Sequence, residues 1–114
     1  MKITTNVASD TLKYIGVKPS LKGFDYLVYA IANYRDENCS MESIYRTISH
    51  YYDVSRASIE RNARHAITNC FHHTMTNKVW TEVFSNTIDT DRGCPKLKEF
   101  IACVVNYLEQ KEVK

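Results

Sequence analysis

At 114 residues, the chain has the length of a single domain. Its hydrophobic fraction of 44% and its charged fraction of 25% are typical of a globular protein. The formal net charge of +2 excludes a polycationic tail and a strongly basic field over the whole molecule, so any contact with nucleic acid must come from a local patch.

The first third of the chain contains two segments with helical periodicity. Ser9–Ile15 predicts a short amphipathic helix that stops at Gly16, and residues 1–8 ahead of it are expected to be a loose end. After the linker VKPSLKG, the run FDYLVYAIANYRDE that follows Gly23 predicts a central helix, because its apolar residues recur at i, i+3, i+4, i+7 and i+10. These residues are Phe24, Leu27, Val28, Ile31 and Tyr34.

Two further helices are expected in the middle of the chain, with a short joint between them. Ser40 can cap a helix over Met41–Tyr52, and Ser55 is a natural N-cap for a helix from Arg56 to about His72. Asp53 and Val54 form the joint. The expected inward residues of the first helix are Ile44, Ile48 and either Tyr51 or Tyr52. The second helix carries a single apolar stripe of Ile59, Ala63, Ala66 and Cys70.

The last third predicts two more helices. Residues 75–84 predict a short helix, and Ser85–Cys94 predicts a polar loop after it. Pro95 suits the first turn of a final helix, and residues 110–114 are expected to be a loose end. The inward residues are expected to be Val79, Trp80, Val83 and Phe84 in the short helix and Leu97, Phe100, Ile101, Val104 and Leu108 in the final one. No segment alternates like a strand. The sequence therefore predicts one all-α domain over residues 1–114, with about six helices, as a winged-helix-like bundle without a sheet.

The two middle helices, over about residues 41–72, have the pattern of a helix-turn-helix. This motif needs an apolar anchor on the first helix, a small residue where the second helix crosses, an apolar residue in the turn and one that pins the second helix. Ile48, Ser49, Val54 and Ile59 meet these four requirements in that order. The usual turn glycine is replaced by Asp53, which tolerates left-handed backbone better than most residues.

The outward face of the second helix carries positive charge. With about 100° per residue, Arg61 and Arg64 lie opposite the apolar stripe, and Glu60 and His65 lie on the shoulders. The arginine fork suits N7 and O6 of guanine, and a glutamate can accept a hydrogen bond from cytosine N4. The competing interpretation is a solvated helix face with i,i+4 ion pairs, such as Glu60 with Arg64. Periodicity alone favours that second interpretation.

A family resemblance favours the DNA-binding interpretation. The segment IERNARHAI, preceded by YRTISHYYDVS, closely resembles the signature of the C-terminal DNA-binding effector domain of the sporulation initiation response regulator, the stage 0 sporulation protein A family of endospore-forming Firmicutes. The resemblance is collinear. It begins with IGVKPSLKGFDYL (Ile15–Leu27) and continues through VFSNTI (Val83–Ile88) and PKLKEFIACV (Pro95–Val104).

The resemblance implies a six-helix transcription regulator that recognises a short GTCG-containing box of double-stranded DNA through the second helix of its helix-turn-helix. Carried over position by position, the DNA-reading residues fall on Glu60, Arg61, Arg64 and His65. Arg61 and Arg64 are then the principal base readers, and Glu60 helps to specify the base or to orient the two arginines. His65, together with Arg56 in the first turn, contacts phosphates or neighbouring bases.

Two residues of this helix depart from the family pattern. Ser58, which belongs to the expected DNA-binding set, stands where the family typically has a basic residue, and Asn62 replaces a small apolar residue. Loss of a groove-side arginine removes about 1–3 kcal/mol of discrimination at one base, so altered specificity or weaker binding is expected. Asp89 and Asp91 also lie in a loop where the family tends to be more basic.

The family couples this domain to an N-terminal phosphorylatable receiver, whose aspartate cluster this sequence lacks. We therefore expect either an excised fragment or a stand-alone effector domain. The resemblance also implies possible dimers on tandem DNA sites and a contact with an RNA polymerase sigma factor, for which Lys78, Thr81 and Glu82 are candidates. The alternative function is a receiver-less protein-interaction module that modulates the full-length regulator or RNA polymerase with weak or no DNA binding.

Enzymatic and metal-binding functions are disfavoured. Cys70, His72 and His73 cluster near a helix end, but adjacent histidines point about 100° apart and no second Cys/His pair has knuckle spacing, so we expect no metal. A thiolate pair of Cys70 with His65 or His50 lacks a glycine-rich oxyanion loop, so no catalysis and no cofactor are expected.

The location expected from the sequence is the cytoplasm. The four cysteines are scattered, the N-terminal MKITTNVASD has no apolar core of a signal peptide, and no apolar run approaches the length that spans a membrane. Reduced thiols and no membrane association follow from these features.

Overall fold

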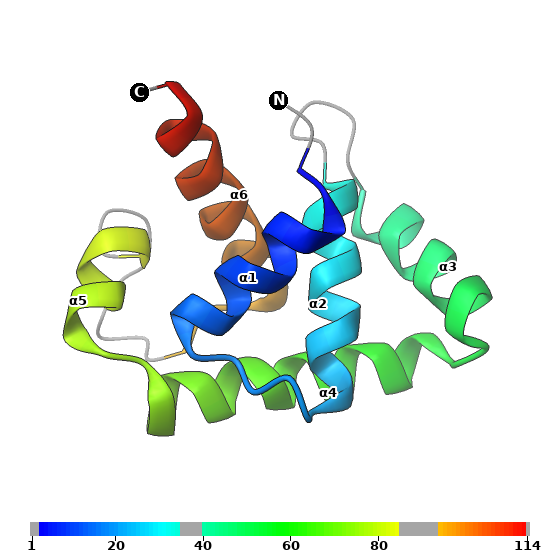
Figure 1. Cartoon of the computed structure of the whole chain (residues 1–114). Helices are drawn as coiled ribbons and strands as arrows, with labels where there is room; N and C mark the ends of the chain where they lie inside the picture. Colours follow the sequence, from blue (N-terminus) through cyan, green and yellow to red (C-terminus); the bar gives the residue numbers. More distant parts are fainter. Residues whose placement is uncertain (1–2, 35–39, 85–93, 114) are drawn as a thin grey trace.

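Helices form all the regular secondary structure in the computed structural model of the chain, which describes residues 3–34, 40–84 and 94–113 (Figure 1). The all-α prediction is confirmed. The α-helices are α1 (Thr5–Ile15), α2 (Lys22–Asn33), α3 (Met41–Tyr52), α4 (Arg56–Asn69), α5 (Asn77–Val79) and α6 (Leu97–Val113), and two π-helical turns, η1 (Cys70–Thr74) and η2 (Trp80–Phe84), follow α4 and α5.

The helices extend into both expected loose ends, over residues 5–8 and residues 110–113. α1 begins at Thr5 because the hydroxyl of Thr4 accepts a hydrogen bond from the Val7 N–H and caps the helix, and Ile3 ahead of it is buried in the core. α6 continues to Val113, since no glycine or proline interrupts its last turns. The prediction of loose residues 1–8 and 110–114 is therefore wrong for most of both segments.

Two helix ends differ from the predicted ones. α2 stops at Asn33, because Tyr34 adopts an extended backbone, and the residues that follow it, 35–39, lie outside the described residues. Pro95 is not part of the first turn of α6, which begins at Leu97. The backbone N–H of Lys96 instead donates to Glu99 Oε1 over 3.0 Å, which caps the helix one residue after the proline.

The end of α4 widens into a different hydrogen-bond pattern from the one predicted. The α-helix ends at Asn69, and the chain continues to Thr74 as the π-helical turn η1 rather than as α-helix to His72. The hydroxyl of Thr74 then donates to the carbonyl of Gly16 over 2.5 Å and so ties η1 to the end of α1. The short helix predicted over residues 75–84 is present as α5 and η2.

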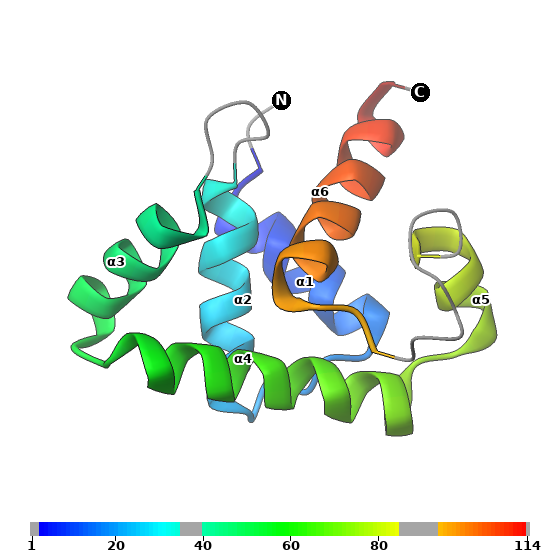
Figure 2. The ribbon, with the colours of Figure 1, turned by 180° about the vertical axis from the view of Figure 1, so that it is seen from behind.

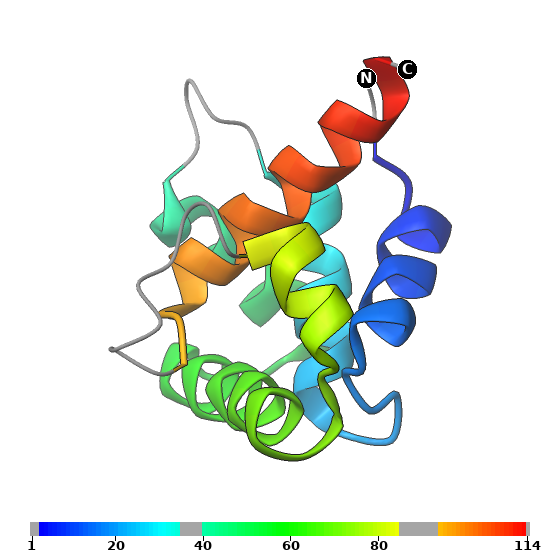
Figure 3. The same ribbon diagram turned by 90° about the vertical axis from the view of Figure 1, so that its left-hand side faces the viewer.

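The helices are stacked on one side of α4. Figure 1 shows α4 along one edge of the molecule, with α3 at its start and α5 at its end, and Figure 2 shows the same arrangement from behind. In Figure 3, α4 is seen nearly end-on in green, and the other helices lie together above it. The side of α4 opposite to them is consequently left open by the part of the chain that the structure describes.

The tightest packing in this arrangement is between α2 and α4, the most extensive contact between described helices. Gly23, in the first turn of α2, lies directly against the backbone of α4. A Cβ atom at this position would lie 2.1 Å from the carbonyl oxygen of Asn62 and 2.9 Å from the Cα of Ala63, closer than real Cβ atoms approach other atoms. Only glycine fits here without a shift of one helix backbone.

We expect Gly23→Ala to lower the free energy of unfolding by about 1–3 kcal/mol, because the added methyl group must push α2 away from α4. Urea unfolding followed by circular dichroism measures this change. Lys22→Ala, at the exposed neighbouring position, is the control and should leave stability nearly unchanged. Equal stability of the two variants would contradict the close approach.

Candidate nucleic-acid interface

The turn between α3 and α4 has the geometry expected of a helix-turn-helix. Asp53 adopts a left-handed conformation, with φ 55° and ψ 52°, as predicted for the residue that replaces the turn glycine. Its N–H and that of Val54 both bond to the carbonyl of Ser49. The hydroxyl of Ser49 in turn donates to the carbonyl of Val54 over 2.5 Å. Ser49 therefore stabilises the turn both as an acceptor and as a donor of hydrogen bonds. The sequence had singled it out only for its small size.

The start of α4 is set by Ser55, whose hydroxyl accepts a hydrogen bond from the Ser58 N–H over 3.1 Å. Beyond this cap the helix separates into two faces, as the projection predicts. The apolar stripe of Ile59, Ala63, Ala66 and Cys70 is buried. The opposite face contains a shallow open hollow lined by Ala57, Glu60, Arg61, Arg64, His65 and Thr68.

Arg61 and Arg64 are exposed in the middle of this open face. Neither forms a hydrogen bond or ion pair within the part of the chain that the structure describes. The i,i+4 pair of Glu60 with Arg64, the example given for the competing interpretation, is not formed, and Glu60 instead accepts a hydrogen bond from Arg56. Both guanidinium groups therefore keep their donors available for an external acceptor.

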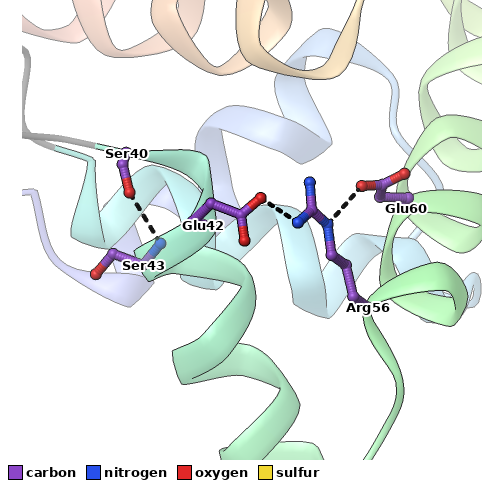
Figure 4. Close-up of polar contacts among 5 residues, drawn as sticks. All are labelled: Ser40, Glu42, Ser43, Arg56 and Glu60. Carbon is purple, nitrogen blue, oxygen red and sulfur yellow. Dashed lines mark hydrogen bonds and ion pairs between the residues drawn. The ribbon is translucent and has the colours of Figure 1, made fainter.

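Arg56 differs from these two arginines because its guanidinium already has partners, as Figure 4 shows. Its Nε donates to Glu60 Oε1 over 3.0 Å, its Nη1 donates to the carboxylate of Glu42 on α3, and its Cζ lies 4.8 Å from the centroid of the Tyr45 ring. The hydrogen bonds to Glu60 and Glu42 raise the pKa of Arg56, so this side chain is a permanent cation. The sequence pointed to Arg64 rather than Arg56 as the i,i+4 partner of Glu60, and it could not reveal Glu42, which lies on another helix.

Ser58 and Asn62, the two departures from the family pattern, are bonded to each other. Asn62 Nδ2 donates to the carbonyl of Ser58 over 2.8 Å and approaches its hydroxyl oxygen to 3.3 Å. Both side chains are half-buried on the flank of α4 next to the exposed His65. The structure therefore brings the predicted residues Arg61, Arg64 and His65 to one open surface and ties Ser58, Glu60 and Arg56 to neighbours within the domain.

The other sequence candidates lie away from this surface. Cys70 is fully buried, while His72 and His73 are exposed beyond the end of α4. No group of three or more histidine, cysteine or acidic side chains suited to a metal ion occurs among residues 3–34, 40–84 and 94–113. Asp89 and Asp91, predicted to make their loop acidic, lie outside the described residues.

The residues suggested for a sigma-factor contact lie on α5 and η2. Lys78, Thr81 and Glu82 are all exposed, but Glu82 already accepts a hydrogen bond of 2.5 Å from the hydroxyl of Tyr14 on α1. This hydrogen bond is the largest of the effects that raise the pKa of Tyr14 to about 12. Behind these residues, Trp80 and Phe84 pack around Phe71, as the prediction of inward aromatic rings requires.

None of the described helices combines the length and the apolar character that crossing a bilayer would need. The fold and the open face of α4 together define a helix-turn-helix domain of the DNA-binding class.

The family itself follows from a direct comparison. Residues 8–108 match the family model described as "Sporulation initiation factor Spo0A C terminal", and the chain belongs to this family. It is accordingly a DNA-binding effector domain of sporulation response regulators, which act in the regulation of transcription.

Asp53→Gly should raise the free energy of unfolding by roughly 1 kcal/mol, because glycine adopts the left-handed backbone of the turn without the steric cost of a Cβ atom. Thermal and urea unfolding measure the gain. Asp53→Asn is the control for the lost charge and should remain within a few tenths of a kcal/mol of the parent protein. A glycine variant that is less stable than the parent would show that the Asp53 side chain, not its backbone, stabilises the turn.

Burial raises the pKa of the Cys70 thiol to about 11, so about one in a thousand of these thiols is ionised at pH 8. We expect iodoacetamide at pH 8 to modify Cys70 far more slowly than the partly exposed Cys94. Peptide mass spectrometry gives the two rates, and in urea they should become similar. Equal modification rates of Cys70 and Cys94 in the native protein would show that the Cys70 thiol is not protected by burial.

Proposed function

We propose that this domain recognises a short GTCG-type box of double-stranded DNA by placing α4 in the major groove. The single observation that carries the proposal is the pair of exposed arginines, Arg61 and Arg64, which lie opposite the buried stripe and have no partner among the described residues. An arginine fork can donate to N7 and O6 of guanine at the same time, the commonest specific contact between a protein and a base pair.

The surrounding residues would have supporting roles. His65, exposed one position beyond Arg64, would contact a phosphate or a neighbouring base. Glu60 accepts a hydrogen bond from Arg56 through Oε1. Its second carboxylate oxygen would accept a hydrogen bond from cytosine N4 or orient the arginines. Ser58, bonded to Asn62, supplies only a neutral hydroxyl where the family carries a positive charge, and we therefore expect weaker or altered reading of one base.

The open side of α4 supports this docking geometry. In a helix-turn-helix complex the second helix enters the groove while the first crosses the phosphate backbone. The other described helices lie on the opposite side of α4, as Figure 3 shows, so a duplex can reach the open face of α4 with α3 beside its phosphate backbone. Phosphate contacts would position the domain, and the base contacts of the arginines would supply the sequence preference.

The remaining partners are proposals that come from the family resemblance. They are a second copy of the domain on tandem DNA sites and an RNA polymerase sigma factor that contacts the exposed face of α5 and η2. Action on chromosomal DNA would place the protein in the cytoplasm.

A fluorescence anisotropy titration tests the function directly. A duplex that contains the GTCG box should bind more tightly than a scrambled duplex, and both affinities should fall steeply between two salt concentrations because bound cations are released from the phosphates. Equal affinity for the two duplexes would reject sequence recognition. Absence of DNA binding would favour the alternative, a protein-interaction module.

Arg64→Ala should reduce the preference for the box over the scrambled duplex by about 5- to 150-fold, which corresponds to about 1–3 kcal/mol for a lost bidentate contact. Lys111→Ala, which removes one positive charge near the far end of α6, is the matched control and should preserve the preference. An unchanged preference in Arg64→Ala, with the protein folded, would show that Arg64 does not read a base.

A further inference from the structure

Arg56 is the one cation of the proposed DNA-binding set that already has ionic partners within the described residues. Its guanidinium lies between two carboxylates, that of Glu42 on α3 and that of Glu60 on α4, as Figure 4 shows. The three side chains together carry a net charge of about −1, because one cation is shared between two carboxylates. The start of α4 is thus electrostatically unlike its middle, where Arg61 and Arg64 have no anionic partner among residues 3–34, 40–84 and 94–113.

The contact between Arg56 and Glu42 can be exchanged for one with an external anion. The side chains are 52% and 59% exposed, so both are in contact with water, and ion pairs in that position are weak and easily broken. Glu60 is less exposed, at 32%, and is four residues from Arg56 on the same helix, where the geometry favours the pair. Glu42 is therefore the partner that Arg56 can release most readily.

In the proposed docking geometry, this group would lie beside a phosphate backbone. Arg56 is the first residue of α4, and residues at the start of the second helix lie closest to DNA in helix-turn-helix complexes. Glu42 lies in the first turn of α3, the helix that crosses the backbone in the same geometry. A phosphate oxygen at that point would meet the Nη1 donor of Arg56 and also the negative charge of Glu42.

We propose that Glu42 competes with a DNA phosphate for the guanidinium of Arg56. In the free domain Glu42 holds Arg56 across the α3–α4 joint. When the domain docks, a phosphate oxygen replaces the Glu42 carboxylate at Nη1, while Glu60 keeps Nε and fixes the direction of the side chain. The inference rests on the proposed function, because it requires α4 to meet DNA.

This exchange has a specific consequence for binding. A phosphate carries no base identity, so competition at Arg56 lowers the affinity for every sequence by the same factor and leaves the preference for the box unchanged. Glu42 is then a positioning residue that acts through Arg56 and sets the strength of binding, while the arginines in the middle of α4 set its selectivity.

Glu42→Gln tests the competition. In anisotropy titrations at low salt, this variant should bind the box duplex and the scrambled duplex at least about threefold more tightly than the parent, with the ratio between the two duplexes unchanged. Glu109→Gln, on the exposed surface near the far end of α6, removes the same charge and is the matched control, expected to bind like the parent. No gain in Glu42→Gln, or an equal gain in Glu109→Gln, would overturn the proposal.

A double-mutant cycle shows whether Glu42 acts through Arg56. In an Arg56→Gln background, Glu42→Gln should give no further gain, because the group for which Glu42 competes is gone. A full gain in that background would mean that Glu42 merely repels DNA as a nearby charge, and the proposal would be wrong. Thermal unfolding of each variant confirms that the folded domain is compared, and Glu42→Ala provides a second variant should Glu42→Gln unfold.

The scrambled duplex separates this inference from the proposed function. If the parent binds both duplexes equally and Arg64→Ala changes nothing, sequence recognition fails, yet exchange at Arg56 is still visible as tighter binding of Glu42→Gln to either duplex. If the box preference holds and Glu42→Gln binds like the parent, only the exchange fails. Absence of any DNA binding overturns both.

Discussion

The arrangement of this domain depends on the contact between the backbones of α2 and α4 at Gly23. No side chain separates the two helices at this point, and a single methyl group would overlap the carbonyl of Asn62. This close approach holds the buried stripe of α4, from Ile59 to Cys70, against the rest of the core. Because the inner face of a helix determines the direction of its outer face, the same contact points Arg61 and Arg64 away from the protein. The direction of the open face of α4 is therefore set by packing on the opposite side of the helix.

The electrostatics of α4 follow a division between its start and its middle. With a net charge of only +2, the domain cannot rely on a general positive field and must concentrate attraction on a few side chains. Glu60 forms its ion pair with Arg56 rather than with Arg64, and the middle of the helix therefore keeps its positive charge. It also makes the first turn locally acidic together with Glu42. Selectivity and overall affinity would thus depend on different residues of one helix, which lets each be altered with little effect on the other.

The two departures from the family pattern have a common structural explanation. Asn62 donates to the carbonyl of Ser58 and approaches its hydroxyl, while its own backbone carbonyl is covered by Gly23. The pair lies where the helix flank changes from core to solvent, so its hydrogen bonds satisfy polar groups that a small apolar residue would not bring there. Ser58 removes a charge from the flank of the interface, and Asn62 stabilises the hydroxyl that replaces it.

The sequence by itself determined the order of the helices, though not all of their ends, together with the buried stripe of α4 and the left-handed turn at Asp53, because these depend on periodicity and on capping residues within a few positions. The family could be assigned for the same reason, since the motif is local, whereas the DNA-reading positions taken from that motif stay a prediction. Tertiary structure alone decided which partner Arg56 takes, because Glu42 is on another helix and its direction depends on how α3 crosses α4. The hydrogen bond between Tyr14 and Glu82 and the glycine contact of α2 with α4 were also beyond sequence reasoning. Each joins residues far apart in the chain, whose proximity is a result of packing rather than of local propensity.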